Sequence, residues 1–390
     1  MPGYEIFDDE ERDAVNEIFD LNGGVLFAHG FDNIRNGVYK VREFEKTAKK
    51  EFNVKYTQAV SSCTAALRIA LASINFKKGD EVIIPSFTFV ATAEAVNEAG
   101  GKLVVVDIDE SLNLCPIEFE NAITEKTKAV IPVHMMSSPA EMDKICNISK
   151  RHNIRVIEDA AWGVGATWKG TPLGTIGDIG CYSFDAGKCI STGEGGMILT
   201  NNIDIFKKAR AFHDHGHEYS TNISRGEEGA IGIGFNYRMT ELQAAIGIVQ
   251  LKKLDKIISS QRSNKGFLKK SLIDGGFPYK FRKHNDENGD GCDALFFTLE
   301  NKKQTEIFLK KINELNINTK NVPDAIKWHF SKYWAHIFEK SELYNLNYKT
   351  IWKKSSDILE SSIALPIMIK STKEELEILS DNLLRISKNI

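Results

Sequence analysis

One lysine lies between two short apolar segments that the sequence predicts to be buried strands. The segments are residues 179–184 and 197–200, Lys188 lies between them, and three of residues 193–196 are glycine. A lysine held near a core loses hydration, which lowers the pKa of its ammonium group and leaves a nucleophilic amine. Glycines beside it let a flat ligand approach the backbone. This pattern favours Schiff-base chemistry with a carbonyl, for which pyridoxal phosphate (PLP) is the commonest partner; a solvated lysine on a surface turn is the alternative.

A carboxylate that could assist this lysine follows another apolar segment. Residues 154–159 are predicted to form a buried strand that ends at Asp159. Acids at the carboxyl end of a parallel strand usually face a ligand crevice. PLP needs such an acid beside its ring nitrogen, because the protonated ring is the electron sink of the reaction. We therefore predict Lys188 and Asp159 as the catalytic residues.

A third group of residues is suited to a phosphate. The predicted strand 55–61 leads into Ser62, Cys63 and Thr64, which open a predicted helix. The free N–H groups of a helix N-terminus bind phosphate well. An ordinary Ser/Thr helix cap is the alternative, and the presence of Lys188 and Asp159 favours phosphate binding.

These motifs resemble the DegT/DnrJ/EryC1/StrS aminotransferases, a branch of the fold-type I PLP enzymes that acts mostly on sugars. The resemblance rests on Glu158-Asp-Ala-Ala and on Ser183-Phe-x-x-x-Lys188-x-x-x-x-Gly-Glu-Gly-Gly196, and it extends from about residue 7 to the C-terminus. It implies a transaminase that moves an amino group from an amino acid, L-glutamate by analogy, to the aldehyde or ketone of a carbohydrate for surface polysaccharide biosynthesis. Sugar dehydratases of the family carry histidine in place of the lysine, so Lys188 favours transamination.

The resemblance also implies which residues bind the cofactor. They are Cys63, Thr64, Phe89, Asp159, Trp162, Ser183, Lys188 and Asn236. Phe89 would stack on the ring and Ser183 would bind the phosphate, whereas Trp162 stands where relatives carry Gln or His. Asn236 would reach the phosphate of a second chain, which implies a homodimer with shared active sites. The residues expected at the substrate are Arg225, Arg238 and His329.

The sequence leaves several candidates for the amino acceptor. The segments that begin at Arg35 and Lys327 most resemble the subgroup that aminates the 8-aldehyde of a 3-deoxy-octulosonate (an 8-oxo-3-deoxy-octulosonate). A nucleotide-linked keto-sugar is the family's commonest substrate. A small phosphorylated ketone such as dihydroxyacetone phosphate is the alternative, since Arg225 and Arg238 could bind its phosphate. A non-catalytic binding protein with this fold would have no need to keep Lys188 and Asp159.

Alternating predicted strands and helices indicate an α/β fold. The apolar strands are expected at residues 55–61, 81–85, 102–107, 129–133, 154–159, 179–184 and 197–200. This alternation predicts a mostly parallel central sheet with helices on both faces, and the resemblance specifies the fold-type I PLP-transferase architecture. We predict a large PLP-binding domain with an N-terminal arm at 1–255 and a smaller C-terminal α+β domain at 256–390.

Composition narrows the class of protein further. The 390-residue chain carries a formal net charge of −3, which gives no basic field for nucleic acid or membrane binding. It has no apolar run of about 18 residues, and its N-terminus lacks the apolar region of a signal peptide. Six scattered cysteines favour reduced thiols and a cytoplasmic location. His213, His215 and His217 lie on a polar loop without a fixed face, so we predict no metal site.

Overall fold

A seven-stranded sheet forms the centre of the molecule. The structure is a computed structural model that describes residues 2–220, 222–338 and 347–390. The strands occur in the order β1-β9-β8-β5-β4-β2-β3. Their bounds are β1 Tyr56–Val60, β2 Glu81–Pro85, β3 Lys102–Val106, β4 Thr127–Val130, β5 Arg155–Asp159, β8 Ile179–Ser183 and β9 Gly196–Thr200. A separate small hairpin consists of β6 Thr167–Trp168 and β7 Thr171–Pro172.

The sheet is mostly parallel, as the sequence predicts. Strands β8, β5, β4, β2 and β3 pair in parallel, whereas β9 runs antiparallel to both β8 and β1. In the parallel part, Asp159 at the end of β5 pairs with Cys181 of β8. The carboxyl ends of these strands therefore meet at one edge, where an open α/β sheet binds ligands.

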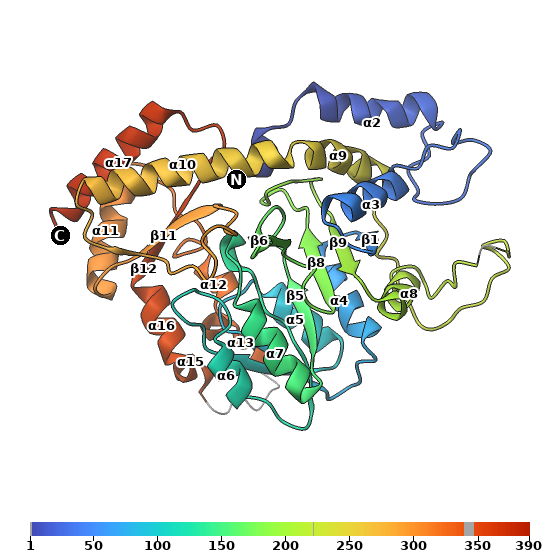
Figure 1. The fold of residues 1–390 in the computed structure, drawn as a ribbon, viewed down its shortest axis with the longest axis horizontal. Helices are drawn as coiled ribbons and strands as arrows, with labels where there is room; N and C mark the ends of the chain where they lie inside the picture. The colour runs from blue at the N-terminus through green and yellow to red at the C-terminus, as the bar shows by residue number, and fades with distance from the viewer. Residues whose placement is uncertain (1, 221, 339–346) are drawn as a thin grey trace.

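Helices cover both faces of the sheet because its strands are apolar on both sides. In β9, Met197 and Leu199 belong to one hydrophobic cluster and Ile198 to another. Successive side chains of a strand point to opposite faces, so each face needs its own cover, and Figure 1 shows helices on both sides. The helices before the C-terminal third are α1 Pro2–Glu5, α2 Asp9–Leu21, α3 Lys40–Glu51, α4 Cys63–Ser73, α5 Ala91–Glu98, α6 Pro116–Asn121, α7 Met142–His152, α8 Ile203–Phe212, α9 Glu241–Lys252 and α10 Leu254–Asp274.

A smaller sheet with its own core lies in the C-terminal third. Its strands pair antiparallel in the order β10 (Lys280–Phe281), β11 (Ala294–Thr298) and β12 (Ser362–Pro366). Helices α10, α11 (Lys302–Glu314) and α17 (Lys373–Ser387) contribute to the hydrophobic cluster around it. The long α10 leads from the large sheet to the small one (Figure 1).

The short helices between Ile326 and Glu360 return to the large sheet. They are α12 Ile326–His329, α13 Ala335–Phe338, α15 Tyr348–Ile351 and α16 Lys353–Glu360. Trp334 and Trp352 join the cluster of the large sheet, and the Trp352 indole donates a hydrogen bond to the carbonyl of Val105. The two parts thus share apolar contacts, and the domain boundary at residue 255 stays a prediction.

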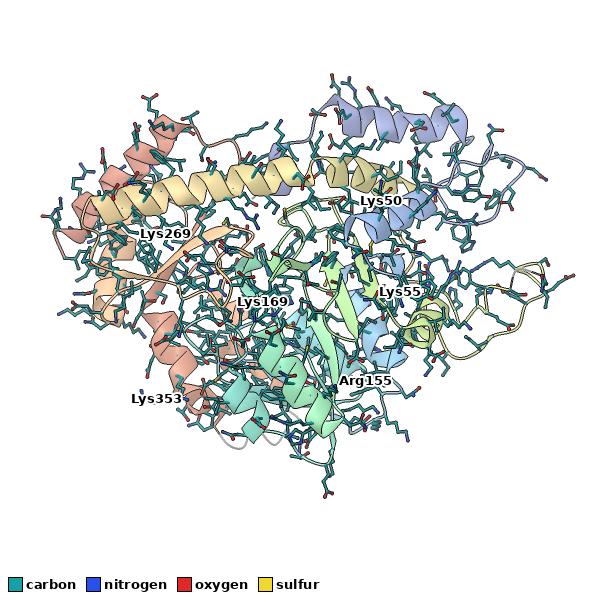
Figure 2. The ribbon with its side chains drawn as sticks, in the orientation of Figure 1. Lys50, Lys55, Arg155, Lys169, Lys269 and Lys353 are labelled. Atoms are coloured by element: carbon teal, nitrogen blue, oxygen red, sulfur yellow. The ribbon has the colours of Figure 1, made fainter. Side chains whose placement is uncertain are left out.

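Two segments extend from the same end of the molecule. They are the loop between α2 and α3 and the loop after α8 (Figure 1). Both contain exposed apolar side chains, among them Phe31 and Ile233, and Ile233 is 82% exposed. The labelled basic residues Lys50, Lys55, Arg155, Lys169, Lys269 and Lys353 are spread over several elements (Figure 2). None of the described helices is long and apolar enough to cross a membrane.

Candidate active site

Lys188 lies on the turn between β8 and β9, with its amine turned into the protein. Its Nζ is 3.5 Å from the centre of the Trp162 ring. Burial lowers the pKa of the Lys188 ammonium group, and the charge of Asp185 opposes that shift. The charges of Asp159 and Asp293 oppose the shift as well. The Trp162 ring that lies against the amine argues against a freely solvated surface lysine.

Asp159 ends β5 as a buried carboxylate. Thr92 Oγ1 donates a hydrogen bond to its Oδ2 at 2.7 Å, and the backbone N–H of Ala161 donates to its Oδ1 at 3.2 Å. Burial raises the pKa of Asp159, while these hydrogen bonds and the Lys188 charge act against the rise. An acid desolvated in this way gains from a cationic partner, which a protonated ring nitrogen would be.

The N-terminus of α4 forms another wall of the site. Ser62 caps this helix, because its Oγ accepts a hydrogen bond from the N–H of Ala65 at 3.1 Å. The first-turn N–H groups of Cys63 and Thr64 have no intrahelical acceptor and remain suited to an anion. Gly196 is required for this packing, since a Cβ there would come within 2.4–2.7 Å of the Ser62–Cys63 backbone.

These elements surround one cavity of about 110 Å³. Its walls include all but one of the residues predicted to bind the cofactor: Cys63, Thr64, Phe89, Asp159, Trp162, Ser183 and Lys188. An amine, a carboxylate and a helix N-terminus with a nearby hydroxyl match the aldehyde, ring nitrogen and phosphate of PLP respectively. The residues present therefore fit this cofactor.

The exception is Asn236, which lies with the predicted substrate arginines in a second group. Asn236 forms a β-bridge with Asp214, and Arg225 and Arg238 form ion pairs with the same aspartate. Contacts from His29, Tyr219 and Arg225 hold the pKa of Asp214 well below its usual range despite its burial. The two arginines line a separate cavity of about 360 Å³. None of these three side chains lines the Lys188 cavity.

His329, the third predicted substrate residue, lies at the edge of the Lys188 cavity. Its ring centre is 5.2 Å from that of Phe89. Its Nδ1–H donates to the carbonyl of Ala325 at 2.9 Å, and burial lowers its pKa to about 4. His329 is therefore neutral at pH 7 and leaves Nε2 as a hydrogen-bond acceptor.

Sequence reasoning missed several side chains of this site, among them Thr92 and Asp185. Thr92, in the first turn of α5, hydrogen-bonds Asp159, and Asp185 lines the cavity beside Lys188. A hydroxyl that follows strand β2 is a signal that could have identified Thr92. Among the described residues there is no cluster of ligands that could hold a metal ion.

The comparisons with known proteins agree with this geometry. The family model of the DegT/DnrJ/EryC1/StrS aminotransferase family matches residues 29–383. The chain belongs to this family. Its sequence is 41% identical over 231 residues to the GDP-perosamine synthase of Caulobacter vibrioides, which covers 59% of this chain and 61% of that enzyme. It is also 41% identical over 223 residues to the spore coat polysaccharide biosynthesis protein SpsC of Bacillus subtilis, covering 55% and 57%. The matches therefore span less than two thirds of either relative.

A solved structure supports the assignment across nearly the whole chain. The NtdA protein of Bacillus subtilis, solved with bound cofactor PMP, aligns with a TM-score of 0.83 at 26% identity and covers 98% of this chain and 83% of its own. This member of the DegT/DnrJ/EryC1/StrS family is a PLP-dependent aminotransferase. The predicted fold, enzyme class and cofactor are confirmed, whereas the roles of individual residues stay predictions.

Proposed function

We propose that this aminotransferase moves an amino group from L-glutamate to the aldehyde or ketone of a carbohydrate for surface polysaccharide biosynthesis. The observation that carries the proposal is the Lys188 amine against Trp162, in one cavity with the Asp159 carboxylate. The names of the relatives, GDP-perosamine synthase and a spore coat polysaccharide biosynthesis protein, support a carbohydrate acceptor. They favour it over dihydroxyacetone phosphate or a non-catalytic role. A nucleotide-linked keto-sugar and an 8-oxo-3-deoxy-octulosonate are the two candidates.

Each residue of the cavity has its own proposed role in the reaction. When bound, PLP supplies an electron-withdrawing ring that stabilises negative charge on the carbon next to the substrate nitrogen. Lys188 Nζ would hold the cofactor and would then act as general base and acid, taking the proton from the Cα of the amino donor. Asp159 would keep the ring nitrogen protonated. The α4 N-terminus and Ser183 would bind the phosphate, and Phe89 would pack on the ring.

The active site is proposed to be shared by two copies of the chain. Asn236 and Arg238 contact Asp214, and neither of their side chains lines the Lys188 cavity of their own chain. They belong to the segment after α8, which includes exposed apolar side chains such as Ile233. A homodimer that buries this segment would bring Asn236 to the phosphate of the partner's cofactor. The cytoplasmic location also stays a prediction, which the six free cysteines support.

Absorption spectroscopy tests the proposed reaction. The holoenzyme should be yellow, and L-glutamate should bleach this colour as the cofactor accepts the amino group. The bleached enzyme is then mixed with keto-sugars, octulosonates and triose phosphates, and the compound that restores the colour identifies the acceptor class. Failure of every amino acid to change the spectrum would exclude transamination, and restoration by triose phosphates alone would exclude a carbohydrate acceptor.

A further inference from the structure

A buried ion pair at the smaller sheet lies beside Trp162, whose ring lines the active-site cavity. Asp293 directly precedes β11, and Lys320 lies between α11 and α12. Their side chains form an ion pair and are only 6% and 4% exposed. Lys320 Nζ is 5.0 Å from the centre of the Trp162 ring, against which the Lys188 amine also lies. The pair and the reactive amine are thus neighbours of one indole.

This pair has hydrogen-bonding capacity that the chain does not use. Among the described residues, Asp293 Oδ2 is buried without a hydrogen-bond partner, and so is the side-chain nitrogen of Asn321, next to Lys320. An ammonium group carries three N–H donors, and Asp293 Oδ1 takes one of those of Lys320. Buried polar groups almost always have partners. The unpartnered Asp293 oxygen and the remaining N–H donors of Lys320 lie together in this ion pair and are available to a ligand.

The combination of groups selects the chemistry of that ligand. A carboxylate or phosphate would accept from Lys320 and Asn321, but Asp293 would repel it. A hydroxyl group donates one hydrogen bond and accepts others, so neighbouring hydroxyls satisfy Asp293 and Lys320 together. The pKa of Lys188, which burial lowers, is raised in part by the charge of Asp293, so the pair lies within electrostatic range of the reacting amine.

We propose that Asp293 and Lys320, with Asn321, bind hydroxyl groups of the carbohydrate acceptor and set the enzyme's specificity for a hydroxylated carbonyl compound. Asp293 Oδ2 accepts from one hydroxyl, and Lys320 donates to the same hydroxyl or to its neighbour. The inference rests on the proposed function, because it assigns the acceptor's hydroxyls to named residues. It also gives the smaller sheet a direct part in substrate choice.

The test compares Asp293→Asn and Lys320→Met with a matched control. Lys265→Met removes the cation of another buried pair, Lys265 with Asp290, in the same part of the chain. The pyridoxamine form of each holoenzyme is mixed with the carbonyl sugar that reacts best with the wild type, and separately with 2-oxoglutarate, which has no hydroxyl. Both pair variants should raise KM for the sugar about tenfold or more, which is the usual effect of losing a hydrogen bond to a charged group. The reaction of the pyridoxamine form with 2-oxoglutarate, and that of the PLP form with L-glutamate, should keep a KM within about twofold of the wild type. Every reaction of the control variant should do the same.

A binding measurement makes the test independent of turnover. The same sugar is titrated by calorimetry into Lys188→Ala protein loaded with pyridoxamine phosphate, with and without Asp293→Asn. The second substitution should weaken Kd about tenfold or more. Asp293→Asn carries the test if Lys320→Met fails to fold, since the amide keeps the shape and still accepts from Lys320.

Four results would overturn the inference. An equal rise in KM for the sugar and for 2-oxoglutarate would show that the pair only supports the fold. A loss with both L-glutamate and 2-oxoglutarate, but not with the sugar, would assign Lys320 to the carboxylate of the amino donor. An unchanged KM and Kd for the sugar would show that the pair does not bind it. If no sugar reacts with the wild type, the proposed carbohydrate acceptor itself is wrong, and the inference falls with it.

Discussion

Two adjacent acids show how the fold assigns different roles to neighbouring residues. Successive side chains of β5 point to opposite faces, so Asp159 faces the cavity while Glu158 faces the protein interior. The Glu158 carboxylate accepts hydrogen bonds from the N–H groups of Gly174, Ile176 and Gly177. It also bonds Nε2 of His134 at 3.0 Å. Because the N–H of Ala140 donates to Nδ1 of that ring, Nε2 must carry the proton and donate to Glu158.

This arrangement predicts opposite outcomes for two matched substitutions. Asp159→Asn removes the charge that keeps the ring nitrogen protonated, so kcat should fall by about two orders of magnitude or more, in line with loss of a buried charge pair. Its free energy of unfolding should change little. Glu158→Gln turns an amide NH₂ toward several N–H donors, so it should cost about 1–3 kcal/mol of stability or more. Steady-state kinetics and urea unfolding of both variants check this, and a stable but inactive Glu158→Gln enzyme would contradict it.

Acids also join whole elements, and a partly buried glutamate, Glu45, connects helix α3 to strand β1. Glu45 of α3 accepts hydrogen bonds from the side chain of Gln58 at 2.7 Å and from the N–H of Ala59 at 2.9 Å. Burial raises the pKa of Glu45 to about 7, against the bond from Ala59 and the charges of Arg210 and Arg42. The contact between the two elements is therefore sensitive to pH.

The sign of this pH dependence follows from proton binding. Between the ordinary pKa of a glutamate and about 7, the folded state holds a proton on Glu45 that the unfolded state has lost. Stability from this group is therefore present at low pH and is lost as pH rises to about 7. Glu45→Gln imitates the protonated form, so its stability relative to wild type should increase by on the order of 2 kcal/mol between pH 5 and pH 8. Urea unfolding across this range measures it. Glu51→Gln, on an exposed position of the same helix, serves as control, and a constant difference for Glu45→Gln would refute the prediction.

Elements with a clear apolar pattern were predictable from sequence, whereas contacts across the fold were not. Strand β2 has its predicted bounds, and β5 and β8 differ from theirs by one residue, because each is a short apolar run between polar turns. Helix α8 was not predicted, since its charged residues resemble those of the polar loop that follows. Lys188 and Asp159 could be identified because their residue types and neighbours are unusual. Thr92 and Lys320 could not, because their roles come from tertiary contacts.

At the scale of the whole molecule, the two loops after α2 and α8 combine exposed apolar side chains with buried charged groups. The loop after α2 contacts the loop after α8, since His29 Nε2 is 3.4 Å from Asp214 and Arg238 lies over Phe27 at 4.9 Å. Arg35 stabilises the first loop by donating to the carbonyls of Phe27, Gly30 and Val38. The same two loops carry exposed apolar side chains such as Phe31 and Ile233. A second copy of the chain would cover them in the proposed homodimer. Symmetric homodimers are the commonest assemblies of this kind.

A shared active site makes a quantitative prediction for mixed dimers. Lys188→Ala removes the amine of a site, and Asn236→Ala removes the residue that is proposed to reach the partner's site, so each variant alone should be nearly inactive. After exchange of equal amounts, half of the dimers contain one chain of each kind, and one of their two sites has both residues intact. Activity should then return to about one quarter of the wild-type value per site. Mixing Lys188→Ala with Asp159→Asn should restore nothing, because both residues act within one chain. Activity assays after subunit exchange, verified by mass-tagged chains, measure the recovery. If the first mixture exchanges chains but stays as inactive as the second, Asn236 does not act across the interface.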